Sequence, residues 1–130
     1  KLAHEKGIQV VPLVGPSSIL LALMASGMNG QSFAFTGYLP IDKNEKKSAL
    51  RNLEKWSQEK NQAQLFMETP YRNNKFLEDI LTTLHPQTNL CIACDVTLPT
   101  EYIKTKNVID WKKQKVDLHN RPCIFIIQKN

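Results

Sequence analysis

The sequence predicts an α/β domain in which a mixed sheet is flanked by helices. Short apolar, β-branched runs alternate along the chain with segments whose apolar residues recur at helical spacing, as expected when strands alternate with helices. The chain has 130 residues, of which 42% are hydrophobic. This is enough for one compact core but too short for two ordinary domains. No internal repeat, low-complexity tract or long linker divides the sequence.

The first predicted elements are a strand and a helix. Residues 8–14 are apolar and β-branched and are followed by Gly15 and Pro16, which indicates a buried strand entering a tight turn. One of the two serines after this turn caps a helix that stops at Gly27. Because the helix is apolar nearly all round, we expect it to be buried on most of its sides.

The middle of the chain predicts two strands with a surface helix between them. Residues 33–38 alternate at period two and residues 63–67 form a short apolar run, so both are predicted strands. Asp42 is a suitable N-cap for a helix that extends to about residue 60. The apolar positions of this helix are Leu50, Leu53 and Trp56. Its outer side is predicted to be basic and carries Lys46, Lys47, Arg51 and Lys55.

The remaining elements are a second amphipathic helix and three strands. The helix begins near Pro70 and ends before Pro86. Its apolar stripe is formed by Phe76, Leu77, Ile80, Leu81 and Leu84. Residues 90–96 predict a buried strand, residues 101–107 a polar edge strand, and residues 121–127 a core strand.

The three cysteines are expected to be reduced thiols of a cytoplasmic protein, because no signal sequence accompanies them. Cys91 and Cys94 spell a CxxC within the predicted strand 90–96. Side chains an odd number of positions apart on a strand point to opposite faces, so these thiols cannot easily share a metal ion. A structural role is therefore expected, and no metal site is predicted.

Charge and hydropathy bear on two possible partners of the protein, nucleic acid and membrane. The net charge of +5 permits an anionic partner such as RNA, although a solvated basic surface explains it equally well. No apolar run approaches the ~20 residues of a membrane span. The sequence opens without an initiator methionine or the apolar core of a signal peptide, so we interpret it as a piece of a longer protein.

Three successive strand ends carry small, polar or helix-starting residues. They are residues 15–18, 68–72 and 95–97. In open α/β sheets, ligands gather beyond the carboxyl ends of strands, where backbone amides and helix N-termini can donate hydrogen bonds. These loops are the candidate site, with ordinary turn and capping chemistry as the alternative. No GxSxG, HExxH or glycine-rich phosphate loop is present, which disfavours hydrolase and kinase functions.

Four segments at and near these loops carry a resemblance to a known family. Residues 11–18 (VPLVGPSS) are similar to the pattern V-P-x-P-G-x-S-A, and residues 35–40 (FTGYLP) to F-x-G-F-L-P. Residues 65–72 (LFMETPYR) are similar to I-F-Y-E-S-P-H-R, and residues 92–97 (IACDVT) to V-A-R-E-L-T. Because all four motifs occur in the same order, the sequence resembles the tetrapyrrole methylase superfamily. Within that superfamily it resembles a branch of methyltransferases that modify a ribose of ribosomal RNA.

The resemblance implies a fold, a cofactor and a set of site residues. It implies two α/β domains with S-adenosylmethionine in the cleft between them, and a homodimer. Residues 1–15 would be the last strand of a truncated N-terminal domain and its link, and residues 16–130 the C-terminal methylase domain. No catalytic residue or metal ligand is carried over. The cofactor-binding positions carried over from the motifs are Ser17, Ser18, Met67, Glu68, Val96 and Thr97.

This sequence departs from the family pattern beside the expected cleft. The arginine and glutamate of R-E-L-T are Cys94 and Asp95 here, and the lysine that follows is Leu98. Losing an arginine and a lysine removes two potential phosphate contacts. The methyltransferase class is therefore better supported than the RNA substrate. Absence of an activated nucleophile suits methyl transfer, because the sulfonium already activates the methyl group and the protein mainly aligns the reactants.

The expected function is S-adenosylmethionine-dependent methylation of a ribose 2′-hydroxyl of ribosomal RNA, with the fragment inactive alone. Two alternatives stay open: methylation of a tetrapyrrole or other small molecule, and a non-catalytic RNA-binding or dimerisation module. We expect the basic helix 43–60 and the segment 104–115 to assist RNA docking. Without its partner sheet, the strand 8–14 is expected to be poorly ordered or to pair with another chain.

Overall fold

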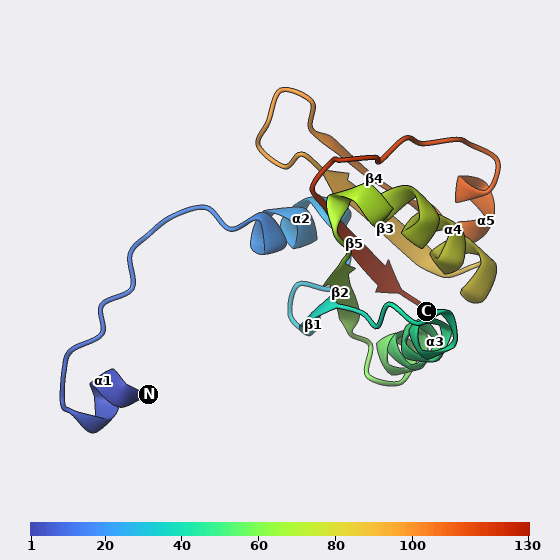
Figure 1. The fold of residues 1–130 in the computed structure, drawn as a ribbon. Coiled ribbons are helices and arrows are strands. Elements are labelled where there is room, and N and C mark those ends of the chain that lie inside the picture. Colours follow the sequence, from blue (N-terminus) through green and yellow to red (C-terminus); the bar gives the residue numbers. More distant parts are fainter.

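The computed structural model describes residues 1–130 and contains a five-stranded mixed sheet (Figure 1). The strand order is β1-β2-β5-β3-β4, so the last strand of the chain lies at the centre. β1 is parallel to β2, and the other neighbours are antiparallel. The strands are β1 (Phe33–Tyr38), β2 (Ala63–Met67), β3 (Asn89–Cys94), β4 (Tyr102–Asn107) and β5 (Cys123–Gln128). The predicted α/β class with a mixed sheet is confirmed.

The helices begin and end where local sequence directs. Asp42 caps α3, since its Oδ1 accepts hydrogen bonds from the backbone N–H groups of Asn44 and Glu45 at 3.1 and 3.0 Å. Gly27 ends α2 in the left-handed conformation, at φ 75°, which a glycine adopts without strain. The helices are α1 (Leu2–Glu5), α2 (Ser18–Ser26), α3 (Lys43–Glu59), the 3₁₀ helix η1 (Pro70–Arg72), α4 (Asn73–Thr83) and α5 (Val108–Trp111).

One face of the sheet is covered by α3, α4 and α5 and holds the larger core, a cluster of 17 buried residues. Three aromatic rings from β2, α4 and β5 meet there: Phe66, Phe76 and Phe125. The indole N–H of Trp111, on α5, donates to the carbonyl of Leu90 at 2.8 Å, so its one polar atom is satisfied. This packing joins all three helices to the central strands.

The opposite face of the sheet is covered by α2 alone. Ala22 and Leu23 of this helix are buried in a smaller core of eight residues. Leu20 and Met24, on the other sides of α2, are 48% and 78% exposed. The prediction that this helix would be buried on most sides is therefore wrong. Its apolar residues extend round the helix, but this chain supplies a packing surface on one side only.

The segment before α2 runs away from the sheet. Figure 1 shows it as an extended stretch ending in the short helix α1. Residues 8–14, predicted as a buried strand, have no regular structure and are exposed, with Leu13 and Val14 almost fully so. A strand requires a hydrogen-bonding partner, and the segment lies beside none of the strands of this chain. The strand prediction is therefore not met within this chain.

Two side chains of α3 lie opposite to their predicted positions. Lys46 is buried, because it shares the inner side of the helix with Leu50 and Leu53. Its Nζ pairs with Oδ2 of Asp79, on α4, at 3.1 Å. Trp56, predicted to be on the apolar stripe, is 43% exposed. Lys46 is therefore removed from the predicted basic surface. No helix of the structure combines the length and apolar character needed to cross a membrane.

Candidate functional site

A pocket with a volume of about 370 Å³ lies at one end of the sheet. β1, β2 and β3 run in the same direction and β5 runs against them. The pocket is therefore formed by the residues at the carboxyl ends of three strands, together with the residues that begin β5. This is the position at which open α/β sheets commonly bind ligands. Its lining includes Ser18, Tyr38, Met67, Glu68, Asp95 and Val96.

The structure brings together four of the six predicted site residues. Ser18, Met67, Glu68 and Val96 come from three separate loops and all line this pocket. Ser17 is the N-cap residue of α2 and lies one position before the lining. Thr97 lines a neighbouring groove of about 360 Å³ together with Met24 and other residues. The three loops selected from the sequence thus each contribute to one cavity, although the first of them, residues 15–18, follows no strand in the structure.

Glu68 is held in one orientation by its own neighbours. It is buried, and its Oε1 accepts the backbone N–H of Thr69 at 2.7 Å and the hydroxyl of the same residue at 3.3 Å. Arg72 Nη1 lies 3.6 Å from the same oxygen. The second oxygen, Oε2, has no hydrogen-bond partner in the chain. Glu68 can therefore accept a hydrogen bond from a ligand while its position stays fixed.

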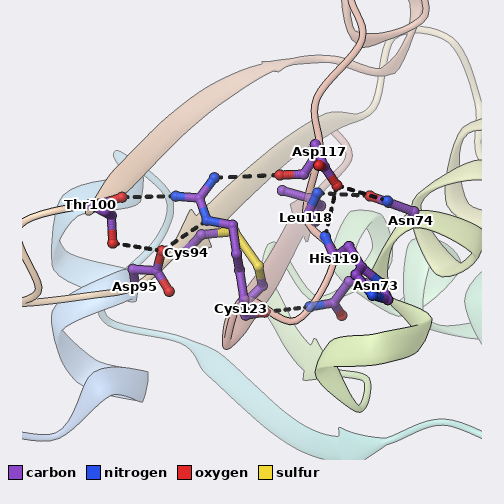
Figure 2. Close-up of a disulfide and its surroundings, with 10 residues drawn as sticks. Asn73, Asn74, Cys94, Asp95, Thr100, Asp117, Leu118, His119 and Cys123 are labelled. Atoms are coloured by element: carbon purple, nitrogen blue, oxygen red, sulfur yellow. Dashed lines mark hydrogen bonds and ion pairs between the residues drawn. A yellow bond between two sulfur atoms is a disulfide. The ribbon is translucent and has the colours of Figure 1, made fainter.

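Asp95 follows β3, and one oxygen of its carboxylate is held by hydrogen bonds from two other residues (Figure 2). Its Oδ2 accepts hydrogen bonds from Arg121 Nε at 2.8 Å and from the Thr100 hydroxyl at 2.9 Å. Arg121 Nη2 also donates to the Thr100 carbonyl at 2.8 Å. The hydrogen bond from the Arg121 guanidinium holds the pKa of Asp95 below its usual value, and the one from Thr100 adds to this. Asp95 is therefore ionised at neutral pH.

The loop that begins at Asp95 has an unusual backbone. Asp95 and Thr97 have left-handed φ angles of 50° and 73°. This conformation is rare for a β-branched residue such as threonine and costs of order 1–3 kcal/mol. The Arg121 network and a hydrogen bond from Leu98 N to Asp95 O at 2.8 Å hold the loop in place. Strain retained in this way is common at ligand sites.

Arg121 and Thr100 were not predicted as part of the site. They lie 26 and 5 positions from Asp95. The contact with Arg121 arises because β5 pairs with β3, which places the Asp95 N–H 2.9 Å from the Pro122 carbonyl. Strand pairing across that separation leaves no local pattern in the sequence. The sequence pattern indicated only that Arg121 begins a core strand, and β5 in fact begins two residues later, at Cys123.

The pairing of β3 with β5 also places Cys94 directly opposite Cys123. The two residues form a disulfide with their Cα atoms 4.2 Å apart (Figure 2). The expectation that all three cysteines are reduced is therefore wrong for this pair. Cys91 is the free cysteine, and burial raises its pKa, so it stays a protonated thiol. Cys91 and Cys94 belong to different cores, as predicted for opposite faces of one strand.

The lining of the pocket indicates binding and alignment of a ligand. Seven of its twelve residues are hydrophobic, and two acidic side chains, Glu68 and Asp95, lie among them. No histidine lines it, and no group of three or more His, Cys, Asp or Glu side chains is placed to hold a metal ion. Such a pocket suits a ligand with a flat apolar part and with hydroxyl or cationic groups that donate to carboxylates.

The fold is found in solved methyltransferase structures. The chain superimposes on the methyltransferase CobJ with a TM-score of 0.59 at 18% identity, covering 98% of this chain and 55% of that one. It superimposes on uroporphyrin III C-methyl transferase of Thermus thermophilus with a TM-score of 0.51 at 14% identity, covering 98% and 54%. The chain therefore has the fold of about one half of these methyltransferases.

The sequence matches point to one group of proteins, each named ribosomal RNA small subunit methyltransferase I. The protein of Buchnera aphidicola (Schizaphis graminum) is 30% identical over 123 residues, covering 92% of this chain and 42% of the relative. That of Vibrio cholerae is 34% identical over 101 residues, covering 78% and 34%. That of Haemophilus influenzae is 33% identical over 128 residues, covering 96% and 44%. No protein-family model matches the chain.

These comparisons confirm the resemblance that the four motifs indicated. The fold is that of the tetrapyrrole methylase type, seen in the solved methyltransferases. Within that type, the chain is similar in sequence to ribosomal RNA small subunit methyltransferase I. The chain spans less than half the length of each of these relatives.

Proposed function

We propose that this chain is the C-terminal part of an S-adenosylmethionine-dependent methyltransferase whose substrate is ribosomal RNA. One observation carries the proposal: Ser18, Met67, Glu68 and Val96, selected from separate motifs, line a single pocket. The similarity to proteins named ribosomal RNA small subunit methyltransferase I supports the same function. In this proposal residues 1–15 belong to the link and last strand of an N-terminal domain, and residues 16–130 form the C-terminal domain.

The residues that line the pocket suit S-adenosylmethionine. The volume of about 370 Å³ lies within the usual range of roughly 300–1,000 Å³ for small-molecule sites. The largely apolar lining suits an adenine ring. Glu68 and Asp95 each have one carboxylate oxygen that no protein group occupies, and these oxygens can accept from ribose hydroxyls or an ammonium group. Ser17 and Thr97 would contribute through backbone groups beside the pocket.

In the proposed reaction, the residues of this chain bind the methyl donor and orient it. The sulfonium of S-adenosylmethionine supplies an activated methyl group, so the protein mainly aligns the donor with its acceptor. Glu68, fixed by the Thr69 N–H, and Asp95, fixed by Arg121, provide two rigid acceptors, one after β2 and one after β3. Rigid acceptors reduce the ordering cost of binding.

The finer features of the function are also proposals. The acceptor is a ribose 2′-hydroxyl, which rests on the resemblance of the four motifs to the branch that modifies that group. The protein acts in the cytoplasm as a homodimer. Exposed apolar residues on α2, such as Leu20 and Met24, suit burial against a further domain or a second subunit.

The test uses the full-length protein with labelled S-adenosylmethionine and small-subunit ribosomal RNA. Val96→Phe is expected to weaken cofactor binding at least about tenfold, because the larger side chain occupies space in the pocket. Ile109→Phe is the matched control, since Ile109 is on α5, away from the lining, and 40% exposed. Calorimetric titration measures affinity, and transfer of label to RNA measures activity.

Three results would contradict the proposal in different ways. Unchanged affinity in Val96→Phe would move the cofactor site elsewhere. Methylation of a tetrapyrrole or another small molecule, with no transfer to RNA, would make the substrate assignment wrong. Binding of RNA by a full-length protein that does not bind S-adenosylmethionine would favour a non-catalytic RNA-binding module.

A further inference from the structure

The outer side of α3 carries four basic residues at regular spacing. Lys43, Lys47, Arg51 and Lys55 follow one another at intervals of four residues, so they form one row along the helix surface. Lys43, Arg51 and Lys55 are exposed, and Lys47 is partly exposed. At about 1.5 Å per residue, the row is roughly 18 Å long. We call these four residues the basic row.

The basic row works against the stability of its own helix. Like charges four residues apart repel, at a cost of a few tenths of a kcal/mol for each pair. Lys43 also lies in the first turn of α3, where the helix dipole disfavours positive charge. Lys43, Lys47 and Arg51 form no ion pair in the chain, and only Lys55 approaches an acid, Glu59, at 3.8 Å. No ion pair within the chain therefore offsets the repulsion among Lys43, Lys47 and Arg51.

The basic row begins near the pocket. Tyr38, the last residue of β1, lines the pocket and is 60% exposed. Lys43, the first residue of α3, follows Tyr38 by five positions. From there α3 returns along the sheet to the residues that precede β2. The row therefore leads from the pocket end of the sheet toward its other end.

The second basic segment predicted from the sequence, residues 104–115, lies elsewhere. It spans part of β4, α5 and the residues that follow α5, whereas α3 packs against β2 and β5. α4 contacts both α3 and α5 and lies between them on this face of the sheet (Figure 1). Part of the charge of residues 104–115 is neutralised within the segment, since Lys113 Nζ pairs with Asp110 Oδ1 at 3.0 Å. The two basic segments do not form one surface.

We propose that the basic row is the docking surface for the sugar-phosphate backbone of the RNA substrate. The inference rests on the proposed function, because it requires that the acceptor is RNA. Lysine and arginine bind phosphates in any sequence, so the row positions the RNA while the pocket holds the methyl donor. Phosphates beside the row would relieve the repulsion between its members, and a phosphate beside Lys43 would also offset the unfavourable interaction of that charge with the helix dipole.

The experiment compares two triple variants of the full-length protein that lose the same charge. The test variant is Lys43→Gln/Lys47→Gln/Arg51→Gln, and the control variant is Lys112→Gln/Lys113→Gln/Lys115→Gln. Affinity for a small-subunit ribosomal RNA transcript is measured over a series of salt concentrations. The test variant is expected to bind RNA at least roughly tenfold more weakly. The slope of the logarithm of its association constant against the logarithm of the salt concentration is expected to be shallower than that of the parent by about 2 to 3. The control variant is expected to bind like the parent.

Further measurements separate docking from other effects. The affinity of the test variant for S-adenosylmethionine is expected to match the parent, and its unfolding midpoint to be no lower, since repulsion has been removed. A test variant that binds RNA like a parent that methylates RNA would overturn the inference and leave the proposed function standing. Equal losses of RNA affinity in both variants would show that net charge alone causes the effect, and this would also overturn the inference. A parent that binds no RNA would overturn the proposed function itself.

Discussion

The two faces of the sheet differ in how completely helices cover them. The face under α3, α4 and α5 has a core of 17 buried residues, whereas the face under α2 has a core of eight. Two residues of the smaller core, Ala93 and Ile124, also line the pocket. The candidate site is therefore on the thinly covered side, where apolar surface and strand ends stay accessible to a ligand.

The two faces also differ in the kinds of residues that they carry. The thickly covered face is filled by close-packed side chains and carries the buried Lys46–Asp79 ion pair. The thinly covered face carries the strained loop at Asp95 and the exposed side of α2. We infer that the thickly covered face supplies most of the folding free energy. The thinly covered face retains accessible apolar surface and a strained loop, which are available for ligand binding.

The largest expected effect is the loss of an aromatic ring from the thickly covered face. Phe125 is fully buried against Phe66 and Phe76, whose ring centroids lie 6.2 and 5.2 Å from its own. Phe125→Ala should lower the free energy of unfolding by about 3–5 kcal/mol, because it opens a cavity in a packed core. Met24→Ala, on α2, should change it by less than about 0.5 kcal/mol, since Met24 is 78% exposed. Urea unfolding of both variants measures the contrast, and similar losses would contradict the comparison of the faces.

Sequence patterns predicted the thickly covered face well. The helical stripe of α4 and the apolar runs of β2, β3 and β5 gave their elements and most of the larger core. Asp42 and Gly27 marked helix ends through chemistry that acts within a few residues. Such signals are local, so a single sequence contains them. The motifs likewise selected Ser18, Met67, Glu68 and Val96, which line the pocket.

Features that depend on pairing between distant segments could not be predicted. The contact of Arg121 with Asp95 and the disulfide between Cys94 and Cys123 both follow from the register of β3 with β5. The burial of Lys46 depends on Asp79, which lies 33 positions away on α4. The exposure of α2 and of residues 8–14 depends on packing surfaces that this chain does not supply. A pattern of apolar residues indicates which side of a helix or strand is suited to burial, but it does not identify the segment that covers that side.

The second expected effect concerns the buried ion pair. The side chains of Lys46 and Asp79 are 9% and 6% exposed, and their charged atoms are 3.1 Å apart. Asp79→Leu should cost about 3 kcal/mol, because it leaves a buried ammonium without its carboxylate. The double variant Lys46→Met/Asp79→Leu should recover most of this loss, since neither charge is then buried. A double-mutant cycle by urea unfolding measures the coupling. A double variant as unstable as Asp79→Leu alone would show that packing, and not charge, causes the loss.

The smallest expected effect tests the loop on the thinly covered face. Asp95→Asn keeps the shape of the side chain but removes the charge that Arg121 and Thr100 contact, and should cost about 1 kcal/mol at neutral pH. The pKa of Asp95 is lowered in the folded state by the Arg121 hydrogen bond. Its contribution is therefore fully present above the unfolded pKa, about 3.9, and is lost as the pH falls through the lower folded value.

The difference in stability between parent and Asp95→Asn should consequently be constant from about pH 8 to pH 6 and should shrink below about pH 4. Taking this difference cancels the other carboxylates, which titrate in both proteins. Urea unfolding at a series of pH values measures it. A difference that stays constant down to pH 3 would mean that the carboxylate charge does not stabilise the loop. The left-handed backbone at Asp95 and Thr97 would then have to be held by the hydrogen bonds of the main chain.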